Sequence, residues 1–342
     1  MQDVLKNAFI EQALACDALG SGFTARLMRA LPEALLAAPQ LMARLGSIPG
    51  DPGPRGASLP LRLAGGLHYL HLSGQEPALQ AAWPPQGDGM PAPLLPGVLA
   101  RHQAWLADWV THAPQTNEVG RSAVLIAGAA WVAARTGLPL QVSELGASAG
   151  LNLNFFRYGL QVGVAVSGDA ASPLLLRPDW RGPAPHPGAV PVIEARGVDL
   201  NPLSAQDDAL RLLAYVWPDQ AARLARMRQA LEIARTHPPQ VDKADAADWL
   251  EARLQAPWPG RCHLVCHTIA HQYFPPASQA RIAAAMEQAG ARASAQAQLA
   301  WLGMEGDAVP GSAGLTLRLW PGDQRLSLGR AGYHGQSVDW AG

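Results

Sequence analysis

The pattern of apolar and polar positions divides the chain into two parts. Up to about residue 135, apolar residues such as Phe9, Leu27 and Leu31 recur at helical spacing. From Leu138 onward, short apolar runs alternate with longer amphipathic stretches. Such alternation of strands and helices indicates a mostly parallel sheet with crossover helices. We therefore predict a helical N-terminal cap region at 1–119 and a Rossmann-like, methyltransferase-type domain at 120–342.

The last two predicted strands are separated only by residues 320–324, which leave no room for a helix. This pair is therefore expected to be antiparallel. The expected fold class is an α/β three-layer sandwich of Rossmann-like type, with a mostly parallel sheet and an antiparallel C-terminal hairpin. The predicted strands are 140–144, 161–166, 190–196, 262–268, 298–304, 315–319 and 325–329. The predicted helices of this domain are 150–158, 207–234, 245–255 and 276–290.

Composition narrows the class of protein. Of the 342 residues, 49% are hydrophobic and 15% are charged, which provides a sizeable core and excludes a disordered chain. The formal net charge is −1 and no lysine cluster occurs, so we expect neither a nucleic-acid nor a membrane partner. Three cysteines do not suggest a disulfide framework. The N-terminus is polar and the longest apolar run is short, so we expect a soluble cytoplasmic protein.

A loop of small residues follows the strand predicted at 140–144. In Glu144-Leu-Gly-Ala-Ser-Ala-Gly150, an acidic residue precedes Gly146, Ser148 and Gly150 at alternate positions. Small residues let the backbone approach a ligand, and a helix that begins at the last glycine directs free N–H groups toward it. This spacing is typical of a nucleotide-binding loop, with Ser148 in place of the middle glycine. Glu144 is predicted either to bind a cationic amine or to organise the loop amides.

Two further carboxylates are candidates for the same site. Asp199 follows the strand predicted at 190–196, where Rossmann-like folds place an acid that accepts hydrogen bonds from ribose hydroxyls. The alternative is a cap on the turn before Pro202. Asp245 precedes the helix predicted at 245–255, either as its N-cap or as a partner for an adenine amino group.

The segment 262–275 contains two cysteines and three histidines. Structural zinc sites usually draw paired ligands from two separated places, and no second pair exists here, so we expect no metal. His267 at the strand end and His271 in the following loop are candidates for proton transfer, unless they are satisfied core histidines. Gln272 and Tyr273 are expected to line the substrate pocket beside them.

Asn117, Glu118 and Arg121 form a polar cluster ahead of the helix that leads into the first strand. We predict that they bind substrate, since Arg121 could hold a carboxylate bidentately. The alternative is that they cap that helix. The chain has neither a Walker A sequence nor a nucleophile elbow, so a P-loop and a serine-hydrolase triad are unsupported.

Five segments of the chain are similar to those of a known family: Gln115-Thr-Asn-Glu-Val-Gly-Arg121, Glu144-Leu-Gly-Ala-Ser-Ala-Gly-Leu-Asn-Leu153, Gly197-Val-Asp-Leu-Asn-Pro202, Val216-Trp-Pro-Asp-Gln220 and His267-Thr-Ile-Ala-His-Gln-Tyr-Phe-Pro275. Together they resemble an uncharacterised bacterial family, domain of unknown function 2332. The resemblance spans nearly the whole chain and implies membership, but no activity.

The second half also resembles class I methyltransferases, which implies S-adenosylmethionine as the cofactor. Two departures are Ser148 and the absence of an Asp/Asn-Pro-Pro-aromatic sequence after the fourth strand, so common amine methylation is not indicated. The resemblance matches Glu144, Gly146, Ser148 and Gly150 to the cofactor loop, Asp199 to the ribose-binding acid and Asp245 to the adenine-binding acid.

The expected function is methyl transfer to a small molecule, with His267 or His271 removing the acceptor's proton where the acceptor requires it. A catalytically silent Rossmann-like module that binds a nucleotide or a partner is the alternative. A nicotinamide-linked oxidoreductase is a third, weaker option, because the antiparallel C-terminal hairpin does not fit a dinucleotide dehydrogenase.

Overall fold

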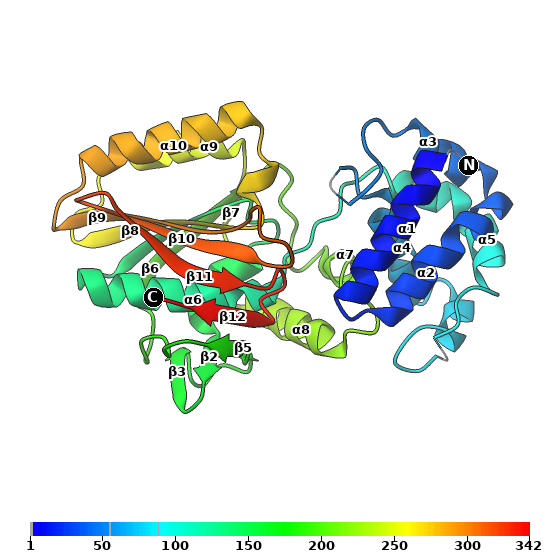
Figure 1. The fold of residues 1–342 in the computed structure, drawn as a ribbon, viewed down its shortest axis with the longest axis horizontal. Helices are drawn as coiled ribbons and strands as arrows, with labels where there is room; N and C mark the ends of the chain where they lie inside the picture. Colours follow the sequence, from blue (N-terminus) through cyan, green and yellow to red (C-terminus); the bar gives the residue numbers. More distant parts are fainter. Residues whose placement is uncertain (1–2, 55, 88) are drawn as a thin grey trace. The chain divides into compact units, whose positions relative to one another are not determined.

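The chain forms two compact units in a computed structural model that describes residues 3–54, 56–87 and 89–342 (Figure 1). The helical unit comprises the described residues of 1–116 together with Asp207–Arg228. The α/β unit comprises Asn117–Gln206 and Gln229–Gly342. The chain therefore passes between the units three times, at 116/117, 206/207 and 228/229.

The helical unit is held together by apolar residues at helical spacing. Its helices are α1 (Asp3–Ala18), α2 (Gly22–Ala34), α3 (Pro39–Ser47), α4 (Leu59–Leu72), α5 (Leu95–Trp109) and α7 (Ala209–Ala214), with 3-10 turns η1 (Leu35–Ala37) and η2 (Pro77–Ala81). Leu31 of α2 and Leu63 and Leu67 of α4 are fully buried in one core. Tyr215, from the returning segment, joins that core. Each fully buried large side chain stabilises the fold by roughly 1.5–3 kcal/mol.

A nine-stranded sheet forms the centre of the α/β unit, in the order β5-β12-β11-β10-β9-β8-β1-β6-β7. Neighbouring strands from β7 to β9 are parallel, whereas β9, β10, β11 and β12 are antiparallel in succession. The predicted fold class is confirmed by this arrangement. The strands are β1 (Leu140–Leu145), β5 (Asp179–Arg181), β6 (Val192–Asp199), β7 (Val241–Lys243), β8 (Arg261–Thr268), β9 (Ala297–Gly306), β10 (Ala313–Trp320), β11 (Gln324–Ala331) and β12 (Ser337–Trp340).

Helices cover both faces of this sheet. Helix α6 (Ser122–Thr136) lies on one face, and α9 (Ala246–Gln255) and α10 (Pro276–Ala291) lie on the other (Figure 1). In chain order, the parallel strands run third, second, first, fourth and fifth across the sheet, as β7-β6-β1-β8-β9. The order reverses between β1 and β8. In open α/β sheets, ligands bind outside the carboxyl ends of the strands at such a switch point.

Three predicted elements differ from those observed. The strand predicted at 161–166 is a hairpin of β2 (Gly159–Val162) and β3 (Ala165–Gly168), which pairs with β4 (Leu175–Leu176) in a separate sheet. Gly163 lies between β2 and β3 with a φ of +58°, so the chain reverses there. The helix predicted at 150–158 is a 3-10 helix, η4 (Leu151–Arg157).

The helix predicted at 207–234 is interrupted. It consists of α7 and of α8 (Ala221–Thr236), and Pro218 lies between them. Proline lacks the amide hydrogen that a continuous helix needs, and its ring disfavours helical backbone in the preceding residue. The last passage between the units, at 228/229, falls within α8.

Candidate functional site

The small-residue loop lies at the carboxyl end of β1, beside the switch point. Gly146, Ser148 and Gly150 have φ values of +72°, +55° and +71°, so Ser148 adopts the left-handed conformation that usually requires glycine. A Cβ atom on Gly146 would lie 2.6 Å from the Cβ of Ala270, in the loop after β8. The two loops that border the switch point therefore approach each other so closely that only glycine fits at position 146.

Glu144 points into this region from the end of β1. The residue is only 2% exposed, and its Oε2 atom has no hydrogen-bond partner among the described residues. Burial raises the pKa of the Glu144 carboxyl to about 8, the negative charge of Asp199 adds to the rise, and the positive charge of Arg121 opposes it. A buried acid without a partner is suited to bind a cationic group, which would stabilise its ionised form.

Asp199 ends β6 and Asp245 lies two residues after β7, and both accept hydrogen bonds from backbone amides. The Oδ2 atom of Asp199 accepts from the amide of Ser148 at 2.9 Å, and its Oδ1 accepts from the amide of Asn201 at 2.9 Å. Asp199 thus organises the glycine loop, although each carboxylate oxygen can accept a further hydrogen bond. Asp245 is the N-cap of α9, and its Oδ1 accepts from the amides of Ala247 and Asp248 at 2.8 and 3.3 Å.

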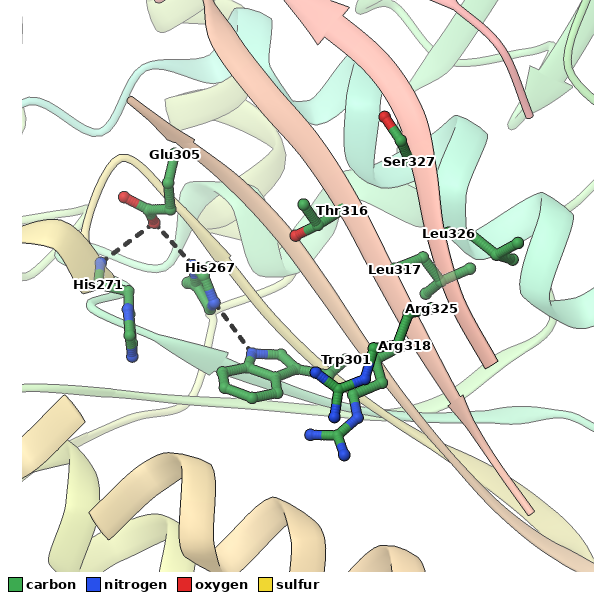
Figure 2. A pocket seen from close by; sticks show the side chains of 10 residues that line it. All are labelled: His267, His271, Trp301, Glu305, Thr316, Leu317, Arg318, Arg325, Leu326 and Ser327. Atoms are coloured by element: carbon green, nitrogen blue, oxygen red, sulfur yellow. Dashed lines mark hydrogen bonds and ion pairs between the residues drawn. The ribbon is translucent and has the colours of Figure 1, made fainter. Parts of the chain in front are cut away.

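His267, at the end of β8, uses both ring nitrogens within the protein. Its Nδ1 lies 2.6 Å from Oε1 of Glu305, and its Nε2 lies 2.9 Å from Nε1 of Trp301 (Figure 2). An indole N–H can only donate, so Nε2 of His267 is the acceptor and the ring proton is on Nδ1. In this arrangement neither nitrogen is free to take a proton from a substrate.

Glu305, on β9, fixes the loop after β8. It accepts hydrogen bonds from the backbone amides of Ala270, His271 and Gln272 at 3.1, 3.1 and 3.3 Å. Burial raises the pKa of its carboxyl, but the hydrogen bond from His267 and those from the loop amides outweigh burial, so the pKa is lowered. No sequence motif singles out Glu305, and only the pairing of β8 with β9 brings it to His267.

His271 begins the short 3-10 turn η5 (His271–Tyr273) and stacks on His267, with ring centroids 4.8 Å apart. Its Nε2 is buried and has no hydrogen-bond partner among the described residues. Burial lowers the pKa of His271, and the proximity of His267 adds to the decrease, while Glu305 opposes it. His271 is therefore neutral at neutral pH. Unlike His267, the other histidine predicted to be catalytic, it keeps a ring nitrogen without a partner among the described residues.

The two neighbours of His271 differ in exposure. Gln272 accepts a hydrogen bond from the amide of Gly306 at 2.7 Å, which ties the turn to β9. The side chain of Tyr273 is 66% exposed.

Asn117, Glu118 and Arg121 are all buried and hydrogen-bonded to nearby backbone. Asn117 accepts from the amide of Leu151 at 2.8 Å, and Glu118 accepts from the amide of Gly120 at 3.1 Å. Arg121 donates to the carbonyl of Thr268, at the end of β8, at 3.1 Å, and to the carbonyl of Tyr333 at 2.9 Å. These contacts hold the segments around the glycine loop in place.

A cavity of about 550 Å³ opens beside the two histidines, on the sheet face that α10 partly covers. His267, His271 and Glu305 lie at one end of it, and Trp301, Arg318 and Arg325 lie toward the other end (Figure 2).

The sequence profile of a bacterial family, described as uncharacterized protein conserved in bacteria (DUF2332), matches residues 6–340. The chain belongs to this family. No curated protein and no solved structure matches this DUF2332 member. Within the described part of this DUF2332 chain, no helix is long and apolar enough to cross a membrane, and no group of three or more His, Cys, Asp or Glu side chains is arranged to hold a metal ion.

Proposed function

We propose that this DUF2332 protein binds S-adenosylmethionine beside the glycine loop and transfers its methyl group to a small molecule. The observation that carries the proposal is the buried Oε2 of Glu144 at the switch point of the sheet, which has no hydrogen-bond partner in the part of the chain that the structure describes. A buried acid in this position is suited to bind a cationic ligand, and the amino-acid end of S-adenosylmethionine carries an ammonium group.

The surrounding residues fit this cofactor. The hydroxyl of Ser148 is buried and has no hydrogen-bond partner among the described residues, so it can bond the carboxylate of the same amino-acid end. Asp199 retains lone pairs for ribose hydroxyls, and Asp245 lies at the end of the next strand, where the adenine would lie. When bound, S-adenosylmethionine supplies an electrophilic methyl group.

The contribution of the protein to the reaction is mainly positioning. Glu305 and His267 hold the turn after β8 in one conformation, which fixes the place of His271. Nε2 of His271 is buried in the free protein, so the ring must turn toward the acceptor before Nε2 receives the proton that the acceptor loses. Holding two reactants in the correct geometry lowers the barrier by converting a bimolecular step into an effectively unimolecular one.

Titration calorimetry with S-adenosylhomocysteine tests the cofactor. We expect the wild type to bind it and Asp199→Ala to bind at least about tenfold more weakly, because loss of the loop hydrogen bonds and of the ribose acceptor each weakens binding. Asp199→Asn, which keeps one acceptor oxygen, should fall between the two. Asp339→Ala, an exposed carboxylate on β12, is the control and should bind as the wild type does. Absence of heat with folded protein, or equal affinity for Asp199→Ala, would contradict the proposal.

A catalytically silent binding module is the second candidate. The contacts of His267 favour this candidate. Both ring nitrogens of His267 are engaged within the protein, so this residue offers no group for chemistry. Binding of S-adenosylhomocysteine without any methyl transfer to a broad panel of acceptors would support this alternative, and detected transfer would exclude it.

A further inference from the structure

The cavity beside His267 is built by cross-strand rows on one face of the sheet. Residues that face each other on neighbouring strands point to the same side, so each row presents its side chains together. One row is His267, Gly303, Thr316 and Ser327, and the next row is Trp301, Arg318 and Arg325. The strands that carry these rows are β8 to β11, and the connections from β9 to β10 and from β10 to β11 contain no helix.

Gly303 lies in the first row, between His267 and Thr316. A Cβ atom at this position would lie 3.0 Å from Cε1 of His267 and 3.0 Å from Oγ1 of Thr316. The absence of a side chain lets His267 and Thr316 lie close together over Gly303. The cavity of about 550 Å³ beside them is large enough for a small organic molecule.

Trp301 supplies a flat wall whose orientation is fixed. Its indole N–H is bonded to His267, and its ring lies 6.0 Å from that of His271, centroid to centroid. The side chain is only half-buried, so part of the ring is accessible from the cavity. Aromatic side chains stack well with planar apolar or aromatic molecules.

The two arginines at the far end of the cavity are not equivalent. Arg318 is bonded to Glu287 and Asp323 and stacks over Trp320 at 4.4 Å, so its charge is largely used within the protein. Among the described residues, Arg325 pairs with Asp323 at 3.3 Å, and its side chain is 66% exposed. A guanidinium has five N–H donors, so Arg325 retains donors for an anionic ligand.

We propose that this cavity holds the methyl acceptor, and that the acceptor is a small aromatic acid. The ring of the acceptor stacks on Trp301, its carboxylate bonds to Arg325, and its reacting group faces His271. This assignment rests on the proposed function. The turn after β8 connects the two places: His271 lines the cavity, and Ala270, the residue before it, packs against Gly146 of the cofactor loop.

The test compares a matched pair of probes, 2-naphthoate and the uncharged 2-naphthamide, by titration calorimetry with the full chain. We expect Arg325→Gln to weaken 2-naphthoate about tenfold and to leave 2-naphthamide unchanged, because only the acid uses the guanidinium. Ser327→Tyr places a large side chain in the cavity from an exposed strand position and should weaken both probes. Arg181→Gln, an exposed arginine on β5 of the same sheet, should change neither.

The outcomes separate this inference from the proposed function. If 2-naphthoate does not bind, or binds equally well to Arg325→Gln, the aromatic-acid cavity is wrong, even where S-adenosylhomocysteine binds as expected. If S-adenosylhomocysteine does not bind, the methyltransferase proposal fails, and with it the role of the cavity as an acceptor site. Arg325-dependent binding of 2-naphthoate together with binding of S-adenosylhomocysteine supports both.

Discussion

Glu144 illustrates what burial does to a single acidic residue. Its carboxyl is enclosed at the end of β1, with Asp199 as a negatively charged neighbour and one oxygen unpartnered. The cost of ionising such a group in the folded protein is large, whereas in the unfolded chain it ionises near its ordinary pKa. The protein retains a destabilising arrangement at this position, which is typical of a binding or catalytic site.

The sign of the resulting pH dependence follows from the raised pKa. Between pH 4.5 and about 8 the unfolded chain loses the Glu144 proton while the folded protein keeps it, so the free energy of unfolding falls as the pH rises. Glu144→Gln lacks this proton equilibrium. Its stability relative to wild type should therefore increase from pH 5 to pH 8, by on the order of a few kcal/mol.

Urea unfolding of both proteins at pH 5, 6.5 and 8 checks this prediction, with Glu232→Gln, a fully exposed acid on α8, as the control. A stability difference between Glu144→Gln and wild type that stays constant with pH would show that Glu144 is not a high-pKa acid. The control should show no pH-dependent gain.

Several side chains have roles that sequence reasoning left open. Asp245 is predicted either as an N-cap or as an adenine partner; its Oδ1 caps α9, while the ligand role stays a prediction. The sequence predicts His267 as a candidate base, yet its partners Glu305 and Trp301 lie on β9, 38 and 34 positions further along the chain. Side-chain partners this distant are set by strand register, which the sequence does not reveal by motif or spacing.

At the scale of the element, the loop after β1 depends on glycine for two separate reasons, backbone conformation and space. Gly146 and Gly260 have nearly the same φ, +72° and +73°, but a Cβ on Gly260 would meet nothing within 4 Å. Gly146→Ala should therefore lose about 1 kcal/mol more than Gly260→Ala in free energy of unfolding, in addition to the backbone strain of roughly 1–2 kcal/mol common to both.

Gly146→Ala should also weaken S-adenosylhomocysteine, because Ala270 must move away from the loop, whereas Gly260→Ala should not. Thermal or urea unfolding and calorimetry on the two variants measure both effects. Equal stability losses for the pair would mean that the loops after β1 and β8 are not in close contact.

The sequence predicts an element best where its pattern of apolar residues extends over many positions. β1, β8 and β9 each carry several apolar residues within six to ten positions, and α9 and α10 carry helical periodicity, so the sequence predicts all five. The strands β7 and β12 contain three and four residues, too few for any period to appear. In η4, Asn152 and Asn154 hydrogen-bond to Ser122 and to the carbonyl of His237, and such polar side chains compete with regular α-helix.

At the scale of the whole molecule, neither unit is one continuous stretch of chain. Residues 207–228 return to the helical unit, where Tyr215 stacks on Trp109 at 6.0 Å and packs against Gly65. The helical core is therefore incomplete in residues 1–116 alone.

We expect residues 1–116 alone to lack a cooperative thermal transition and to bind the dye 8-anilinonaphthalene-1-sulfonate. Joining 207–228 to them through a Gly/Ser linker of about ten residues should restore the transition, since the linker is flexible and the segment supplies the missing core residues. The same fusion with Tyr215→Ser is the control and should restore it less well, because a buried aromatic is lost. A cooperative transition in 1–116 itself would contradict this account.

The threefold passage of the chain between its units has a consequence for biosynthesis. The ribosome must add the 90 residues of 117–206 (206 − 116) before it reaches the segment that completes the helical core. At roughly 5–20 residues per second, the nascent N-terminal helices wait several seconds with apolar surface exposed. Slowing translation across this stretch lengthens the period in which the newborn chain is open to aggregation.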